Sequence, residues 1–242
     1  MLRYNTFSSL KESSMKNIRE YIENKSKLIK EDLDLNMKLG KAEIIVLTDL
    51  SSNINLTKVL RIVSGTLPDE FLYGLDAIYI TEHPDFEKRS INAFYADGAL
   101  YISPDQDDND DLINDIVHEL GHHLEATMPE EIYADGIISD EFISKRMILK
   151  RRLISAGLET GNFNYRNLKY DEEFDLFLLN ELGYDTLSYI TAGLFLSPYA
   201  ATSLREYFAI GFEEFYLGDK EKLNNTSPTL YKKLEELREI TD

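Results

Sequence analysis

The sequence of 242 residues contains no cysteine and no long hydrophobic segment. The absence of cysteine fits the cytoplasm, but it is equally compatible with export, because no disulfide bond needs to form. No apolar run reaches the roughly eighteen residues that a membrane-spanning helix requires, and the first nine residues lack the continuous apolar core of a secretory signal. The sequence therefore predicts no membrane partner. A trimmed leader, or delivery with a phage or another secretion device, keeps the localisation open.

Positive charge is scarce, because 26 lysines and arginines face 44 aspartates and glutamates, which gives a formal net charge of −18. Such a chain lacks the basic surface that neutralises phosphates, so nucleic acids and anionic membranes are not expected partners. The charge favours basic or neutral peptides over acidic ones. A hydrophobic content of 43% indicates a packed globular protein, and no linker and no internal repeat divides it. The sequence does not predict the oligomeric state.

Histidine is also rare, and two of the four histidines stand one helical turn apart. They are His118 and His122, in the sequence His-Glu-Leu-Gly-His. Residues four apart on a helix share a face, so both imidazoles can bind one Zn²⁺. In this H-E-x-x-H pattern, Glu119 is the candidate general base for a metal-activated water. The alternative is a chance match on an acidic helix.

The residues around this motif support a helix. Apolar side chains recur at helical spacing at Leu112, Ile113, Ile116, Val117, Leu120 and Leu124. Asp110 and Asp111 stand at the expected helix start, where carboxylates cap free N–H groups and face the positive end of the helix dipole. The acidic run at residues 105–111 does not fit a calcium-binding EF-hand loop. Counting from Asp105 places Asp110 and Ile116 where that loop needs glycine and glutamate.

The motif itself does not provide the third ligand that a catalytic zinc usually has. His123 points about 100° away from His122 around the helix, and His83 lies in a turn-like Glu-His-Pro sequence. The extended metzincin pattern needs a glycine and a histidine where this chain has Glu125 and Met128, so that class is excluded. We therefore expect a carboxylate from a later segment to complete a His₂Glu site.

Glu206 is the best candidate for that carboxylate. It lies in residues 203–217, an aromatic-rich segment that reads as a largely buried helix, and a buried carboxylate needs a partner such as a metal. Glu213, two turns further on, shares its face and is either the rival ligand or a residue that supports the ligands from behind. A third possibility is that Glu206 pairs with Arg205 or with a lysine at the helix surface.

Three separated elements carry a resemblance to a known family. The H-E-x-x-H sequence at residues 118–122, Tyr199 and the Glu-Tyr-Phe-Ala sequence at residues 206–209 resemble the catalytic domain of anthrax lethal factor and the smaller Pro-Pro endopeptidases. Both are gluzincin metallopeptidases, and lethal factor is a toxin. The resemblance covers mainly residues 92–217. Ile210 stands where the lethal-factor pattern has an acidic residue, so the substrate preference does not carry over.

The resemblance implies a zincin-like fold and a set of roles. It implies that His118, His122 and Glu206 bind one Zn²⁺ and that Glu119 is the general base. It also implies that Tyr199, seven residues before Glu206, donates its hydroxyl to the developing oxyanion. The alternative for Tyr199 is a tyrosine that anchors the core, since the chain contains 15 tyrosines.

The order of the predicted elements indicates an α+β fold. Strand-like segments at residues 43–48 and 76–80 precede a hairpin at residues 91–103, whose turn is the Asp-Gly pair at residues 97–98. Everything after Asp111 reads as helix and connecting loop. We therefore expect a small twisted sheet followed by a mostly helical half.

The sequence divides into the following predicted parts. They are a helical arm at residues 1–38 that packs on the sheet, a zincin-like catalytic domain at residues 39–242, a helical insert at residues 127–196 with helices at residues 170–180 and 186–195, and a closing amphipathic helix at residues 227–240. Compared with the compact members of the resembled family, this insert between the two metal-binding helices is long. Residues 99–103 are expected to form an edge strand beside the H-E-x-x-H helix, along which an extended peptide pairs. The alternative is an interior strand.

These features favour a zinc-dependent endopeptidase that acts on a peptide or protein substrate. The alternative is a metallopeptidase fold used as a binding or structural module with a non-catalytic zinc, and a third possibility is a metallohydrolase that acts on another electrophile. Glu119 separates the first two, because a structural zinc site needs no general base. The sequence predicts neither the substrate nor its cleavage motif.

Overall fold

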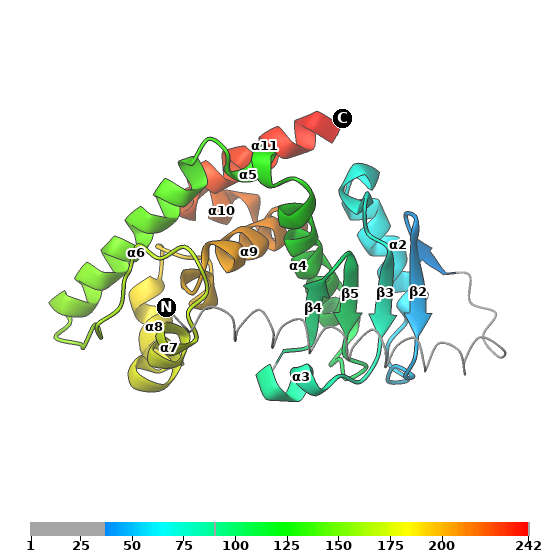
Figure 1. Cartoon of the computed structure of the whole chain (residues 1–242), viewed down its shortest axis with the longest axis horizontal. Helices are drawn as coiled ribbons and strands as arrows, with labels where there is room; N and C mark the ends of the chain where they lie inside the picture. Colours follow the sequence, from blue (N-terminus) through cyan, green and yellow to red (C-terminus); the bar gives the residue numbers. More distant parts are fainter. Residues whose placement is uncertain (1–36, 90, 242) are drawn as a thin grey trace, which may run out of the picture.

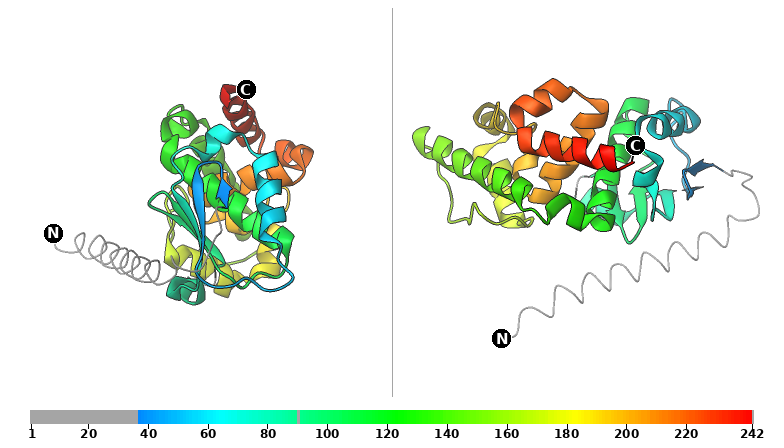
Figure 2. Two further views of the ribbon diagram at one scale, coloured as in Figure 1. Left: turned by 90° about the vertical axis from the view of Figure 1, so that its right-hand side faces the viewer. Right: turned by 90° about the horizontal axis from the view of Figure 1, so that it is seen from above.

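The computed structural model describes residues 37–89 and 91–241 (Figure 1). The helical arm predicted for residues 1–38 lies outside the described residues, except for its last two. Strands come early and helices late, which confirms the predicted α+β class. The sheet with its helix α2 lies at one end of the molecule and the helical half at the other (Figures 1 and 2). No helix in the two described ranges is long and apolar enough to cross a membrane.

The strands of the described residues form one mixed sheet with the order β1-β2-β3-β5-β4. β1 (Lys38–Leu39) pairs antiparallel with β2 (Ala42–Val46), which runs parallel to β3 (Ala77–Ile80). β3 also runs parallel to β5 (Ala99–Ile102), and β4 (Ala93–Ala96) pairs antiparallel with the other side of β5. The sheet thus ends at β4 on the side of the hairpin.

The helices make up most of the remaining chain. They are α2 (Leu56–Thr66), the 3₁₀ helix η1 (Asp69–Leu72), α3 (Pro84–Arg89), α4 (Asn109–Thr127), α5 (Pro129–Tyr133), α6 (Ile137–Ser155), α7 (Glu172–Leu176), the π-helix η2 (Phe177–Leu182), α8 (Tyr184–Thr191), the 3₁₀ helix η3 (Tyr199–Ala201), α9 (Leu204–Leu217), α10 (Lys220–Thr226) and α11 (Pro228–Thr241). The helices predicted at residues 203–217 and 227–240 are α9 and α11. Residues 127–196, the predicted insert, contain α5 to α8.

β4 and β5 form the predicted hairpin, with its turn at the predicted Asp-Gly pair. Asp97 has φ 49° and Gly98 has φ 83°, and a type I′ turn requires a positive φ at both positions. The prediction that residues 99–103 form an edge strand is wrong, because β5 lies between β3 and β4. Both arms of the hairpin have the same alternating pattern, so the pattern does not distinguish the arm that pairs with β3.

The two faces of the sheet carry different clusters because successive residues of a strand point to opposite sides. Ile78 and its neighbours on the same face join the main core together with α2 and α4. On the opposite face, Tyr79 stacks on Tyr101 with 5.3 Å between ring centroids, beside Phe86 of α3. The main core therefore lies between the sheet and α4, which places α4 at the junction of the two halves.

Two buried cations tie α6 to the helical half. Lys145 donates through Nζ to the backbone carbonyls of Leu194 and Thr226. Arg146 is 1% exposed, and its guanidinium carbon lies 4.2 Å from the ring centroid of Phe174. Burial lowers the pKa of both cations, that of Arg146 to about 10. The carbonyls that Lys145 binds stand before and after α9 in the chain, so α6 ties together the segment that precedes this helix and the one that follows it.

α4 and α9 approach closely at Gly121. A Cβ atom on Gly121 would lie 3.1 Å from the Cα and 3.4 Å from the Cβ of Ala209, and 3.5 Å from the Cβ of Phe212. The side of α9 around Ala209 is buried, with Phe208 and Phe212 at 0% exposure. A glycine allows one backbone to approach another this closely, so side chains of the two helices meet next to the contact.

We predict that Gly121→Ala lowers the free energy of unfolding by about 1–3 kcal/mol, because the added methyl forces α9 away from α4. The matched control is Gly65→Ala in α2, where an added Cβ meets nothing within 4 Å. There alanine is the better helix former, so stability should rise by about 0.5 kcal/mol. Urea denaturation of both variants measures the difference. An equal gain of stability in the two variants would contradict the close contact of α4 and α9.

Candidate metal centre

Asp108 fixes the start of α4, the helix that carries the H-E-x-x-H motif. Its side chain accepts hydrogen bonds from the backbone N–H groups of Asp110 at 2.8 Å and Asp111 at 2.9 Å. The cap is thus Asp108, and the predicted capping residues Asp110 and Asp111 lie inside the first turn instead. A capping side chain must come from the residue that precedes the helix. The charges of the first turn still face the positive end of the helix dipole.

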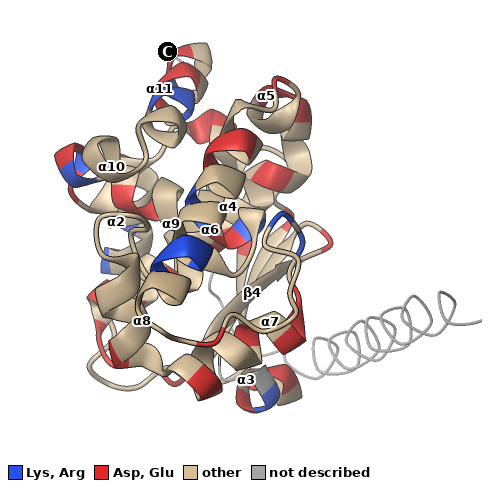
Figure 3. Ribbon diagram, turned by 90° about the vertical axis from the view of Figure 1, so that its left-hand side faces the viewer, with Lys and Arg blue, Asp and Glu red and all other residues tan. Residues whose placement is uncertain are grey.

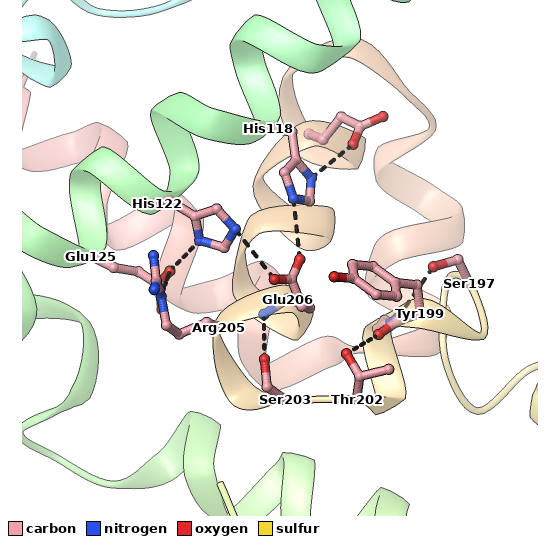
Figure 4. A network of polar contacts seen from close by, with 11 residues as sticks. His118, His122, Glu125, Ser197, Tyr199, Thr202, Ser203, Arg205 and Glu206 are labelled. Carbon is pink, nitrogen blue, oxygen red and sulfur yellow. Dashed lines mark hydrogen bonds and ion pairs between the residues drawn. The ribbon is translucent and has the colours of Figure 1, made fainter. Parts of the chain in front are cut away.

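His118 and His122 project from one face of α4, and both Nε2 atoms face Glu206 of α9 (Figure 4). Glu206 Oε2 lies 3.2 Å from Nε2 of His118, and Glu206 Oε1 lies 3.6 Å from Nε2 of His122. The Ser203 hydroxyl caps α9 by accepting from the Glu206 N–H at 3.1 Å, which holds Glu206 in the first turn. Of the two candidate carboxylates, Glu206 and not Glu213 lies between the imidazoles.

The outer nitrogens of both imidazoles face carboxylates as well. Nδ1 of His118 lies 3.4 Å from Oε2 of Glu213, and Nδ1 of His122 lies 2.8 Å from Oε2 of Glu125. When each ring is neutral and its Nδ1–H donates to the carboxylate behind it, the Nε2 lone pair points to the centre. Metal-bound histidines commonly have this arrangement, in which the outer partner fixes the ring and its tautomer. Glu213 therefore faces the outer nitrogen of His118, on the side of the ring away from Glu206.

Glu125 is the residue of this site that sequence reasoning missed. It entered the sequence analysis only because it departs from the metzincin pattern. In the structure it is 8% exposed and accepts a hydrogen bond from the Tyr133 hydroxyl of α5, while Arg205 Nε lies 3.5 Å from its Oε2. The signal was its position three residues after His122, which places both side chains on one helix face. Arg205 thus pairs with Glu125, and not with Glu206.

Glu119 lies inside the cluster and is 7% exposed. One carboxylate oxygen of Glu119 and one ring nitrogen each of His118 and His122 all lie within 4.8 Å of one another. A carboxylate at this position, next to both imidazoles, reaches any small molecule bound between them.

The charges of the site favour a cation at its centre. Burial by itself lowers the pKa of His118, but the carboxylates of Glu206 and Glu213 outweigh burial and raise that pKa to about 10. Burial likewise opposes the rise for His122, whose pKa reaches about 9 through Glu125 and Glu206. Burial would raise the pKa of Glu206, but the two imidazoles lower it well below its usual range. The carboxylates thus attract either protons on the imidazoles or a metal ion.

The donor set fits Zn²⁺. In a tetrahedral site with bonds of about 2.0–2.1 Å, neighbouring ligand atoms lie about 3.3 Å apart. Each Glu206 oxygen lies near this separation from one imidazole, with Oε2 at 3.2 Å from Nε2 of His118 and Oε1 at 3.6 Å from Nε2 of His122. Two imidazoles and one carboxylate are a ligand set of catalytic zinc sites, and they leave one position open for water.

Tyr199 lies in the segment just before α9, the helix that carries Glu206. It begins η3, directly after Pro198, and its backbone carbonyl accepts from the Thr202 hydroxyl at 2.8 Å. Figure 4 shows the phenol oxygen of Tyr199 pointing toward the Glu206 carboxylate. The residue is 39% exposed, which does not fit the alternative of a core anchor.

The two other histidines lie elsewhere. His83 contacts Phe94 edge-on, with 5.3 Å between ring centroids, on the sheet face that carries α3. His123 is fully buried, and its Nε2 lies 3.0 Å from the carbonyl oxygen of Tyr73. Its ring meets that of Tyr95 of β4, with the centroids 5.4 Å apart. His123 thus faces the sheet and η1 and points away from the imidazole of His122, as its position on the helix predicted.

Asp115 is a further carboxylate on α4, about one turn before His118 and Glu119. Its Oδ2 accepts from Nε2 of Gln106 at 3.2 Å. Burial, together with the nearby charges of Asp111 and Glu119, raises its pKa to about 6, although the bond from Gln106 opposes the rise. Sequence reasoning did not single out this carboxylate, because its burial depends on the packing of residues 103–106 against α4.

Comparison with known proteins adds nothing to these observations. No protein-family model matches the chain, and no curated protein and no solved structure matches it significantly. The assignment of the candidate metal centre therefore rests on the geometry of its residues.

We predict that Glu206→Ala prevents the purified protein from retaining about one Zn²⁺ per chain, because it removes the carboxylate that lies between the imidazoles. Glu213→Ala, the matched control on the same helix, should retain zinc with an affinity reduced by about tenfold, as expected for a residue behind a ligand. Metal analysis by mass spectrometry and zinc titration measure both values. Loss of zinc from Glu213→Ala alone would assign the third ligand to Glu213.

Asp115 gives a prediction for the metal-free protein. Its pKa in the folded state, about 6, lies above the unfolded value of 3.8, so the native state binds more protons between these values. This contribution to stability is present below pH 4 and is lost as the pH rises through 6. Asp115→Asn keeps an oxygen for Gln106, so it should match the wild type at pH 4 and exceed it at pH 7 by on the order of 2 kcal/mol. Denaturation at both pH values tests this, and a constant difference would contradict the raised pKa.

Proposed function

We propose that this protein is a zinc-dependent endopeptidase with a zincin-like catalytic domain. The observation that carries the proposal is the position of Glu206, which α9 places between two imidazoles of α4 at distances that suit a tetrahedral metal. His118, His122 and Glu206 are the proposed ligands. The adjacent Glu119 supports catalysis over a purely structural role.

The chain's own residues divide the proposed reaction among them. A Zn²⁺ ion held by these residues would supply a Lewis acid and would lower the pKa of a bound water to about 7. Glu119 accepts the proton of the attacking water at its carboxylate and delivers it to the nitrogen of the departing amine. The Tyr199 hydroxyl donates a hydrogen bond to the carbonyl oxygen as that oxygen gains negative charge, which contributes about 3 kcal/mol. The carboxylates of Glu213 and Glu125 hold the imidazoles in place.

An extended peptide fits the free edge of the sheet. β4 pairs with β5 on one side, and on its other side no strand pairs with it among residues 37–89 and 91–241. β4 also packs against α4, the helix of the proposed ligands. A peptide that adds to β4 through backbone hydrogen bonds would therefore run beside the metal centre. This assigns to β4 the role that the sequence analysis expected of residues 99–103.

The alternative function, a binding or structural module with a non-catalytic zinc, has less support. A structural zinc site uses four protein ligands and needs no general base. The described part of the chain brings two histidines and Glu206 to the centre, with the carboxylate of Glu119 beside them. This set favours a catalytic site with one open position.

We predict that Glu119→Gln retains about one Zn²⁺ per chain but hydrolyses peptides about 10²–10⁴ times more slowly, because the amide cannot accept the proton. A fluorescence-quenched peptide library, read with and without a zinc chelator, measures the activity. The matched control is Glu131→Gln, which makes the same change at an exposed position of α5 and should leave activity unchanged. Equal turnover by Glu119→Gln and the wild type would contradict the general-base role.

A further inference from the structure

Arg205 lies beside the candidate metal centre, one residue before the proposed third ligand. Neighbouring residues of a helix point about 100° apart, so its side chain does not follow that of Glu206 into the centre. It reaches instead toward the end of α4, where its Nε lies 3.5 Å from Oε2 of Glu125. Arg205 and Tyr199 lie on opposite sides of Glu206 (Figure 4). Since Glu125 also faces Nδ1 of His122 at 2.8 Å, the guanidinium lies next to the candidate metal centre.

The guanidinium of Arg205 is only partly used. Its Nε faces Glu125, and neither Nη atom donates a hydrogen bond to another residue within the described ranges 37–89 and 91–241. The side chain is 60% exposed, whereas that of Glu125 is 6% exposed. The Nη atoms keep N–H donors for a ligand, and a guanidinium binds a carboxylate through two parallel N–H groups.

The charge of Arg205 also reaches the free strand edge. Burial raises the pKa of the Tyr95 phenol on β4, and the positive charge of Arg205 opposes that rise. The same charge opposes the rise that burial and Glu125 cause at Tyr133. The positive charge of Arg205 therefore acts on Tyr95 of the edge strand as well as on residues near the end of α4.

Arg205 is a positively charged side chain in mostly acidic surroundings. Acidic residues predominate on the side of the molecule shown in Figure 3, and the formal net charge is −18. Around the metal centre the carboxylates of Asp115, Glu119 and Glu213 face the same region. A peptide carboxylate is repelled at such positions and attracted beside Arg205. The local charge, and not the net charge, thus determines which group is favoured at this one place.

We propose that Arg205 determines specificity by binding a carboxylate of the peptide substrate within a few residues of the scissile bond. This inference rests on the proposed endopeptidase function and specifies its substrate class. The carboxylate belongs either to an aspartate or glutamate side chain or to the C-terminus of the peptide. Glu125 holds the guanidinium in place before the substrate arrives, which reduces the conformational entropy lost on binding.

The experiment compares peptide pairs that differ by one charge. A peptide cleaved by the zinc-loaded wild type is synthesised with Glu or Gln at each position near the cleaved bond, and with a free or amidated C-terminus. We expect kcat/KM to be at least about tenfold higher for the acid at one position, as suits a bidentate charged hydrogen bond. The Glu/Gln pairs and the acid/amide pair distinguish a side-chain carboxylate from a terminal one.

Arg205→Gln should reduce this preference to about one, with zinc content unchanged by metal analysis. The readout is the ratio of the kcat/KM values of two peptides with the same variant. A general loss of activity lowers both values and therefore cancels in the ratio. Arg151→Gln is the matched control, since it removes an equal charge at an exposed position of α6 and should keep the preference. A second readout needs no hydrolysis: fluorescence anisotropy measures binding of the labelled peptide pair to zinc-loaded Glu119→Gln, with and without Arg205→Gln.

The outcomes separate the two proposals. Cleavage by the wild type with equal rates for every acid and amide pair overturns the inference and leaves the endopeptidase intact. A preference that persists in Arg205→Gln in both rate and binding also overturns the inference. If the zinc-loaded wild type cleaves no peptide of the library, the endopeptidase proposal fails, and the inference fails with it.

Discussion

One carboxylate between two imidazoles joins the two halves of this protein. Glu206 reaches His118 and His122 because α9 lies directly against α4, and that contact exists because Gly121 has no side chain. Without a metal, the pair of helices keeps buried charges of opposite sign together, which is tenable only while the geometry holds. A substitution that separates α4 from α9 therefore also disturbs the cluster of Glu206 and the two imidazoles.

Behind the ligands lies a further layer of carboxylates that reaches into the insert. Glu125 connects His122 to Tyr133, the last residue of α5, and to Arg205 of α9. The helices between α4 and α9 are thus not independent of the candidate site, since the first of them, α5, supplies a hydrogen bond to Glu125. The same acidic surroundings that favour a cation at the centre also surround Arg205, whose side chain is 60% exposed.

The sequence predicted those elements and residues that depend on a short, continuous stretch of the chain. The apolar spacing around residues 118–122 specified the metal-site helix, and the Asp-Gly pair specified the hairpin turn. Aromatic spacing specified α9, which carries Glu206. The arm of the hairpin that pairs with β3 was not predictable, because strand order depends on contacts between distant segments. The role of Glu125 was missed for a similar reason, since Tyr133 and Arg205 approach it only after α5 and α9 have packed.

The buried ammonium group of Lys145 has a consequence for how the molecule opens. It binds carbonyl oxygens at Leu194 and Thr226, on either side of α9 in the chain. Releasing α6 would remove the donor of both carbonyls, and a carbonyl that stays buried without a partner costs about 1–3 kcal/mol. Partial unfolding of α6 alone is therefore unfavourable, because the segments before and after α9 would lose the donor that they share. One lysine of the insert thus links the two segments that flank the helix of Glu206.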